Sequence, residues 1–173
     1  LGSVVGLSLV REFGPVLTAL LVAGRAGSAV AAEVGAMVAT EQLDGLRMMS
    51  VDPVDFVAQP KALALLISMP LLSALFIVFA LAGGYVVGVG LLGIDGGTYI
   101  TNLERNITFS DEVVGSVLKS VVFGALVALI STWRGFTSAP NSAGVSRATT
   151  GAVVQASVAT LVFDYIITAL WGG

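Results

Sequence analysis

Residues 39–61 read ATEQLDGLRMMSVDPVDFVAQPK and form the longest polar interruption between strongly apolar segments. Thr40 is placed to cap a helix, and Glu41 and Asp44 put negative charge into its first turn, where the helix dipole favours it. An Asp-Pro step stops a helix at the far end. The stretch therefore predicts a short helix over residues 40–52, held in a loop between two membrane segments.

This short helix carries an apolar stripe. Leu43, Leu46 and Met49 recur at helical spacing, with Met48 beside them. One interpretation lays the stripe on lipid headgroups, and the other docks it into a groove on a soluble partner. Helices that lie on membranes usually have a polar face rich in Lys and Arg. Here that face holds two acids and the single Arg47, which favours a partner protein.

The composition is that of an all-α integral membrane protein. Hydrophobic residues make up 56% of the 173 residues and charged residues 11%, against about a quarter charged in soluble domains. The net charge of −3 gives no basic footprint for nucleic acid. Cys and His are both absent, which excludes disulfides, thiolate or Ser-His catalysis and histidine-based metal sites.

Four apolar segments are long enough to cross a bilayer, at about residues 1–40, 62–94, 113–133 and 151–170. Pro15 suits the first turn of a helix, so a helix is expected to start there. As a straight helix the second segment would be about 50 Å long, so its end, from Gly83 onward, is expected to be a bent or separate piece. A further short helix is expected around residues 99–106.

Alternation of these segments predicts the topology. It places residues 39–61 and the polar loop 134–150 on one side of the membrane, and residues 95–112 on the other. The first side then holds four basic residues: Arg47, Lys61, Arg134 and Arg147. The second side holds only Arg105. Because basic residues concentrate on the cytoplasmic side, the short helix is predicted to be cytoplasmic.

The first segment has two rows of small residues. One row is Ala19, Ala23, Gly27, Ala31, Gly35 and Ala39, and its neighbour is Gly24, Ser28, Ala32, Ala36 and Thr40. Small residues let another helix approach closely in lipid. The rows predict either packing within the chain, which we favour, or a seam between two copies.

Two charged pairs are candidate functional residues. Arg11-Glu12 is either an ion pair at the interface or the polar lining of a substrate cavity, where the Arg11 guanidinium would suit a phosphate. Lys119 and Asp164 lie on the same side by topology and are expected to form a structural ion pair. A proton relay would need a longer chain of such groups.

Enzyme motifs are missing. The sequence has no GxxxxGK[ST], no HExxH and no GxSxG. No catalytic residue and no metal ligand is predicted, so any energised work requires a nucleotide site on a partner.

Several stretches together resemble the MlaE/YrbE permease family, namely REFGP, AGRAGSA, EQLDGLRMM followed by VDP, and SAGVSRATT. These are membrane subunits of MCE-associated ABC transporters that move phospholipids between bacterial membranes. The resemblance covers essentially the whole chain and implies one permease domain over residues 1–173. It also implies an additional N-terminal membrane helix, which would make five in the full subunit.

The resemblance further implies partners and site residues. Family permeases form homodimers in the inner membrane, bind a cytoplasmic ATPase that holds ATP and Mg, and sit beneath a hexamer of MCE-domain proteins. A STAS-domain protein binds the ATPase, and phospholipid occupies a cavity between the two permeases. Arg11 and Glu12 match the polar pair near that cavity. The coupling-helix motif is matched by Glu41, Gln42, Asp44, Leu46, Arg47 and Met49.

Two other classes remain as alternatives. An ion-coupled secondary transporter would need inverted repeats and several ionisable groups at the membrane midplane, and the sequence shows no convincing repeat. A passive membrane scaffold for a larger assembly would tolerate changes at Arg11 and Glu12.

Overall fold

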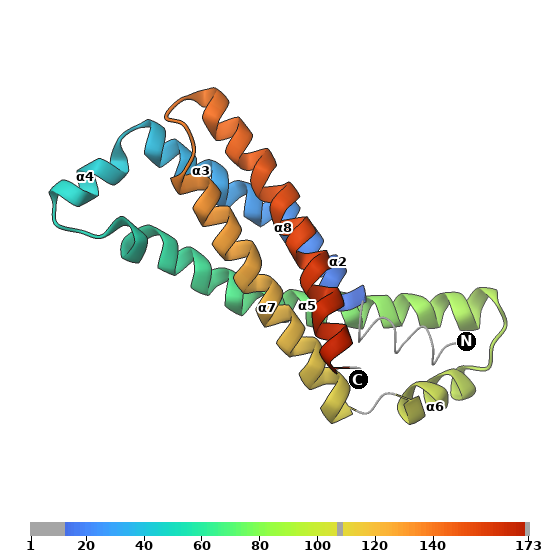
Figure 1. The fold of residues 1–173 in the computed structure, drawn as a ribbon. Coiled ribbons are helices and arrows are strands. Elements are labelled where there is room, and N and C mark those ends of the chain that lie inside the picture. Colours follow the sequence, from blue (N-terminus) through green and yellow to red (C-terminus); the bar gives the residue numbers. More distant parts are fainter. Residues whose placement is uncertain (1–12, 107–108, 172–173) are drawn as a thin grey trace.

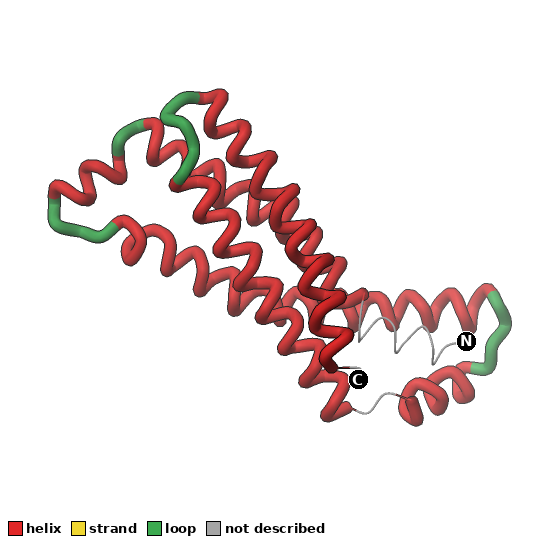
Figure 2. Tube along the Cα trace, viewed as in Figure 1, coloured by secondary structure: helices red, strands yellow, loops and turns green. Residues whose placement is uncertain are grey.

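The computed structural model describes residues 13–106 and 109–171, and within these ranges every regular element is a helix. Four helices are long and apolar enough to cross a membrane: Gly14–Ala39, Val54–Leu91, Val114–Phe136 and Ser142–Leu170. The predicted all-α membrane fold with four spanning helices is confirmed. Short loops join the helices, as Figure 2 shows.

The first spanning helix has three parts: α2 (Gly14–Val22), the π-helical turn η2 (Ala23–Gly27) and α3 (Ser28–Ala39). Pro15 lies in the first turn of α2, where its missing N–H removes no helical bond. One row of small residues is buried from Ala19 to Gly35, whereas the neighbouring row is mostly half-buried or exposed. The first row therefore packs within the chain, which confirms the favoured interpretation.

Close approach explains why this row is small. A side-chain carbon added at Gly27 would lie 2.9 Å from Ser131 Oγ on α7. Across the same seam, a carbon added at Gly135 would lie 2.6 Å from Val34 Cβ. Helices that meet at such positions gain dispersion contacts along their whole length. The first span is thereby fixed against α7 and α8.

The second spanning helix consists of η3 (Val54–Ala58), α5 (Gln59–Tyr85) and η4 (Val86–Leu91). The expected bent or separate piece after Gly83 is wrong, because helix continues through η4 and ends at Leu91. The chain then reverses at Gly93, whose φ of 70° suits glycine. Helix α6 (Gly96–Asn106) follows, close to the predicted position. Its Tyr99 packs edge-on against Tyr85, with ring centroids 5.7 Å apart.

The last two helices are α7 (Phe109–Phe136) and α8 (Ser142–Trp171). The predicted loop at 134–150 is mostly wrong, since only residues 137–141 lie outside the two helices. Asn141 explains the early start of α8, because its Oδ1 accepts a hydrogen bond from Gly144 N at 2.7 Å. In the centre of the bundle, Phe123 and Val127 of α7 pack with Met69 of α5.

The two ends of the bundle differ, as Figure 1 shows. Helix α4 (Gln42–Met48) and the loop between α7 and α8 lie toward one end, while α6 lies at the other. This arrangement confirms that residues 39–61 and 137–141 share a side. We refer below to the side of α4 as the α4 end.

Candidate functional site

Helix α4 begins with a sharp turn in the backbone. Glu41 has a φ of 60°, a left-handed conformation that is uncommon for a residue with a side chain. Ser50 has the same φ, and α4 lies between these two turns. The predicted helix over 40–52 is therefore shorter, because sequence gives no signal for positive φ at Glu or Ser.

The expected caps of this helix are also corrected. Thr40 ends α3 rather than capping α4, and its hydroxyl donates to Ala36 O at 2.8 Å. The same hydroxyl accepts a hydrogen bond from Gln42 Nε2 at 3.0 Å. Asp52 does not stop α4, since its Oδ1 accepts from Val54 N and so caps the next helix. The Gln42–Thr40 hydrogen bond therefore ties α4 to the first span, whereas the Asp52 bond fixes only the start of the second.

The inner face of α4 is anchored in the protein. Leu43 is 5% exposed and packs with Val34 of the first span and Val57 of the second. Leu46 is half-buried against the same cluster. Truncating a buried leucine to alanine costs about 2–5 kcal/mol, so Leu43 sets the position of α4 between the two spans.

The outer face of α4 has no covering within the described chain. Met48 is 89% exposed and Met49 is 72% exposed. Asp44 and Arg47 are exposed and pair with each other at 3.1 Å. A side-chain carbon added at Gly45 would meet nothing within 4 Å. The predicted apolar stripe is thus divided: two leucines point inward, and two methionines point out beside an ion pair.

A second ion pair fixes the two spans that hold α4. Lys61 Nζ of α5 lies 2.7 Å from Glu33 Oε2 of α3. The sequence did not reveal this pair, because it depends on how two spans cross. The Glu33–Lys61 pair lies between the first and second spans, near the end of each span that adjoins α4.

The structure describes only one of the two charged pairs that the sequence predicted. Arg11 and Glu12 lie outside the described residues. Lys119 of α7 and Asp164 of α8 are brought together, with Nζ 3.3 Å from Oδ1 and both side chains largely buried. Lys119 also donates to Thr168 Oγ1 at 3.0 Å. This cluster joins the two helices far from the α4 end.

An exposed charge lies about halfway along the first span. Arg25 belongs to the π-helical turn η2, and its side chain points away from the bundle core. A charge at membrane depth is costly unless it meets protein or a water-filled cavity. In the described part of the chain this side chain is exposed and forms no ion pair.

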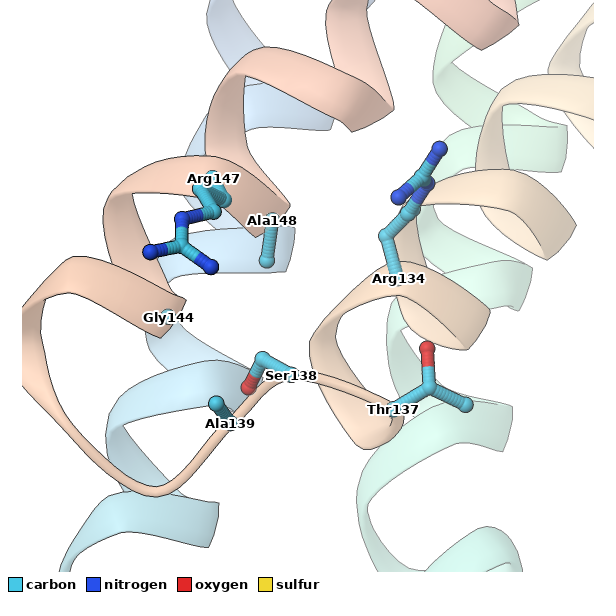
Figure 3. A pocket seen from close by; sticks show the side chains of 7 residues that line it. All are labelled: Arg134, Thr137, Ser138, Ala139, Gly144, Arg147 and Ala148. Carbon is cyan, nitrogen blue, oxygen red and sulfur yellow. The ribbon is translucent and has the colours of Figure 1, made fainter.

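A pocket of about 180 Å³ lies between the end of α7 and the start of α8. Figure 3 shows Arg134 on α7, Thr137 in the loop directly after it, and Arg147 and Ala148 on α8. Arg134 Nε donates to Gln155 Oε1 at 2.7 Å. From the sequence, Arg134 and Arg147 contributed only to the predicted topology, and the pocket was not predicted. Among the described residues, no group of three or more acidic, His or Cys side chains forms a metal site.

Comparison with known proteins shows which family the sequence matches. The family model described as Permease MlaE matches residues 1–170. The chain is 47% identical over its full length to the Haemophilus influenzae "Intermembrane phospholipid transport system permease protein MlaE", of which it covers 66%. It is 42% identical over 99% of its length to a "Probable ABC transporter permease protein" of Rickettsia bellii, again covering 66%.

A more distant match lies in a plant. The chain is 33% identical over 99% of its length to the Arabidopsis thaliana "Protein TRIGALACTOSYLDIACYLGLYCEROL 1, chloroplastic", of which it covers 49%. The chain thus spans just under two thirds of the length of the two bacterial relatives.

Proposed function

Because the chain belongs to the MlaE permease family, we propose that it is the permease part of an ABC transporter for phospholipids. The transporter moves phospholipid between the inner and outer membranes of a bacterium and so maintains the lipid asymmetry of the outer membrane. The chain itself performs no catalysis and binds no cofactor, and a partner subunit holds ATP and Mg. It resides in the inner membrane, with α4 in the cytoplasm.

The observation that carries this proposal is the geometry of α4. Its inner face is anchored through Leu43, while Met48 and Met49 project from its outer face. Exposed methionines adapt their shape to a partner groove. Leu43 packs against both spans, Gln42 bonds to Thr40 at the end of the first span, and the Glu33–Lys61 pair joins the first span to the second. A push on α4 by an ATPase would therefore move the first and second spanning helices together.

The lipid cavity lies between two copies of the chain in this proposal. Arg11 and Glu12 line it, and the Arg11 guanidinium meets the lipid phosphate. The exposed Arg25, about halfway along the first span, supports a cavity of this kind, because a charge there needs water or protein around it. Lys119 and Asp164 have a structural role. A hexamer of MCE-domain proteins covers the far side, and a STAS-domain protein binds the ATPase.

The first experiment tests the coupling surface. Met48→Asp together with Met49→Asp, in the full-length permease co-expressed with its ATPase, should abolish co-purification of the ATPase. The matched control is Met48→Leu with Met49→Leu, which keeps the apolar area and should retain the ATPase. We prefer this pair to changes at Leu46, because Leu46 packs inside the protein and its replacement would also destabilise the fold.

The outcomes separate the alternatives. If the ATPase still co-purifies with the Asp variant, α4 is not the coupling helix. A passive scaffold predicts that Arg11→Ala with Glu12→Ala leaves lipid transfer between vesicles intact, whereas our proposal predicts its loss. An ion-coupled transporter predicts lipid transfer driven by a proton gradient without ATP.

A further inference from the structure

The pocket between α7 and α8 combines charge and shape that the proposed transport mechanism does not use. Arg134 is half-buried and Arg147 is exposed, and both line the pocket with the hydroxyl-bearing Thr137 and Ser138. Within residues 13–106 and 109–171, neither guanidinium forms an ion pair. The N-terminus of α8, at Ser142, adds the positive end of a 30-residue helix. The pocket therefore carries uncompensated positive charge.

The guanidinium of Arg134 is held in place. Its Nε donates to Gln155, which leaves the terminal nitrogens available to another acceptor. A side-chain carbon at Gly151 would lie 2.9 Å from Arg134 Cζ, so the missing side chain makes room for the guanidinium. Such a fixed planar group suits the oxygens of a phosphate.

The pocket lies at the level of lipid headgroups. Helix α8 has 30 residues, which extend about 45 Å against a hydrocarbon core of about 30 Å. The polar residues at its start, Ser142, Ser146 and Arg147, place its first turns outside the hydrocarbon. Trp133, an interfacial residue type, precedes Arg134 and is exposed.

Exposed apolar side chains continue from the pocket toward the membrane. On α7, Leu129 and Trp133 lie two turns and one turn before Thr137, on the same face of the helix. On α8, Val154 and Val158 follow Arg147 at helical spacing. Acyl chains from a headgroup in the pocket would run along these side chains.

From this arrangement we propose that the pocket binds the phosphate of an anionic phospholipid in the leaflet at the α4 end. Two arginines and a helix N-terminus select negative charge, and the apolar side chains beside them select a lipid over a soluble anion. The bound lipid is a resident of the interface and not the transported molecule. The proposal requires only that the chain spans a membrane, so it stands or falls independently of transport.

Trp133 provides a local probe, since the chain has only two tryptophans. Trp171→Phe, with any tryptophan outside residues 1–173 also replaced, leaves Trp133 as the sole fluorophore of the full-length protein. The protein is reconstituted into phosphatidylcholine vesicles that contain either phosphatidylglycerol or phosphatidylcholine with brominated acyl chains. Quenching against mole fraction gives the relative affinity of the two lipids at this position.

We expect phosphatidylglycerol to be preferred about 30-fold over phosphatidylcholine. Two basic residues near a membrane surface attract anionic lipid by about this factor. Arg134→Gln with Arg147→Gln should reduce the preference to about one. Gly151→Ala keeps both charges but displaces the Arg134 guanidinium, so it should also weaken the preference. Lys61→Gln removes a positive charge at the same end outside the pocket and should leave the preference unchanged.

Three outcomes would overturn the proposal. One is equal quenching by the two lipids in the unmodified pocket. Another is a preference that survives the double arginine change. The third is release of the brominated phosphatidylglycerol by millimolar inorganic phosphate but not by chloride of the same ionic strength, which would assign the pocket to a soluble anion.

Discussion

The seam between the first span and α7 contrasts with the outer face of α4. In the seam, every close approach has its partner within the chain: Gly27 meets Ser131, and Val34 meets Gly135. On α4, Met48 and Met49 are largely exposed, and a side-chain carbon added at Gly45 would meet nothing within 4 Å. The difference shows where the chain completes its own packing and where it leaves a surface for another molecule. Substitutions in the seam should therefore act on stability, and substitutions on α4 should act mainly on a partner.

The largest effect is expected inside the bundle, at Lys119 and Asp164. Lys119→Met removes the ammonium group that lies 3.3 Å from the largely buried Asp164 carboxylate, which should lower the free energy of unfolding by about 3–5 kcal/mol. Unfolding in mixed micelles, followed by circular dichroism during a titration with sodium dodecyl sulfate, measures the loss. Lys119→Met with Asp164→Leu removes both charges and should recover most of the stability. A loss below about 1 kcal/mol for the single variant would contradict a structural role.

The next effect concerns the seam itself. Gly135→Ala places a carbon 2.6 Å from Val34 Cβ and should destabilise by about 1–3 kcal/mol, because the two helices must separate. The same titration detects it. Val34→Gly removes the Cβ that the added carbon would meet, so Gly135→Ala should cost less in a Val34→Gly background than in the unmodified protein. An equal cost in both backgrounds would show that this contact is not the cause.

A smaller effect of opposite sign is expected on α4. Gly45→Ala adds a side chain into open space and should stabilise the helix by up to about 1 kcal/mol. If a partner approaches the helix closely at Gly45, the same change weakens ATPase co-purification while stability rises. An unchanged association would place the partner contact on Met48 and Met49 alone.

The smallest effect is expected for the exposed pair on α4. Arg47→Ala removes an ion pair between residues three apart on a helix surface, a contribution of about 0.2–0.5 kcal/mol. The change in unfolding should therefore lie near the error of the titration. A loss of ATPase binding by this variant would show that Arg47 acts on the partner rather than on α4.

Much of the architecture followed from the sequence. Apolar runs long enough to cross a bilayer predicted all four spans, and the row from Ala19 to Gly35 predicted close packing. The topology then brought Lys119 near Asp164. These features depend on periodicity and membrane thickness, which a single sequence carries.

Other features depended on contacts that the sequence does not display. The Ser- and Thr-rich stretch from 142 to 150 has weak helix propensity, yet Asn141 caps it and Gly144 and Gly151 let neighbouring groups approach. The positive φ of Glu41 and Ser50 likewise comes from the connections between helices. The pocket between α7 and α8 was missed for the same reason.

The length of the second spanning helix links this protein to bilayer thickness. Residues 62–91 are apolar and helical, and upright they would extend about 45 Å against about 30 Å of hydrocarbon. A tilt of about 40°, the upper end of the usual range, reduces this extent to about 34 Å. Figure 1 shows α5 crossing α7 obliquely. Lipids with longer acyl chains would therefore favour a more upright helix, and lipids with shorter chains a more tilted one. Because this helix follows α4 in the chain, a change in bilayer thickness would act directly on the span that carries one end of α4.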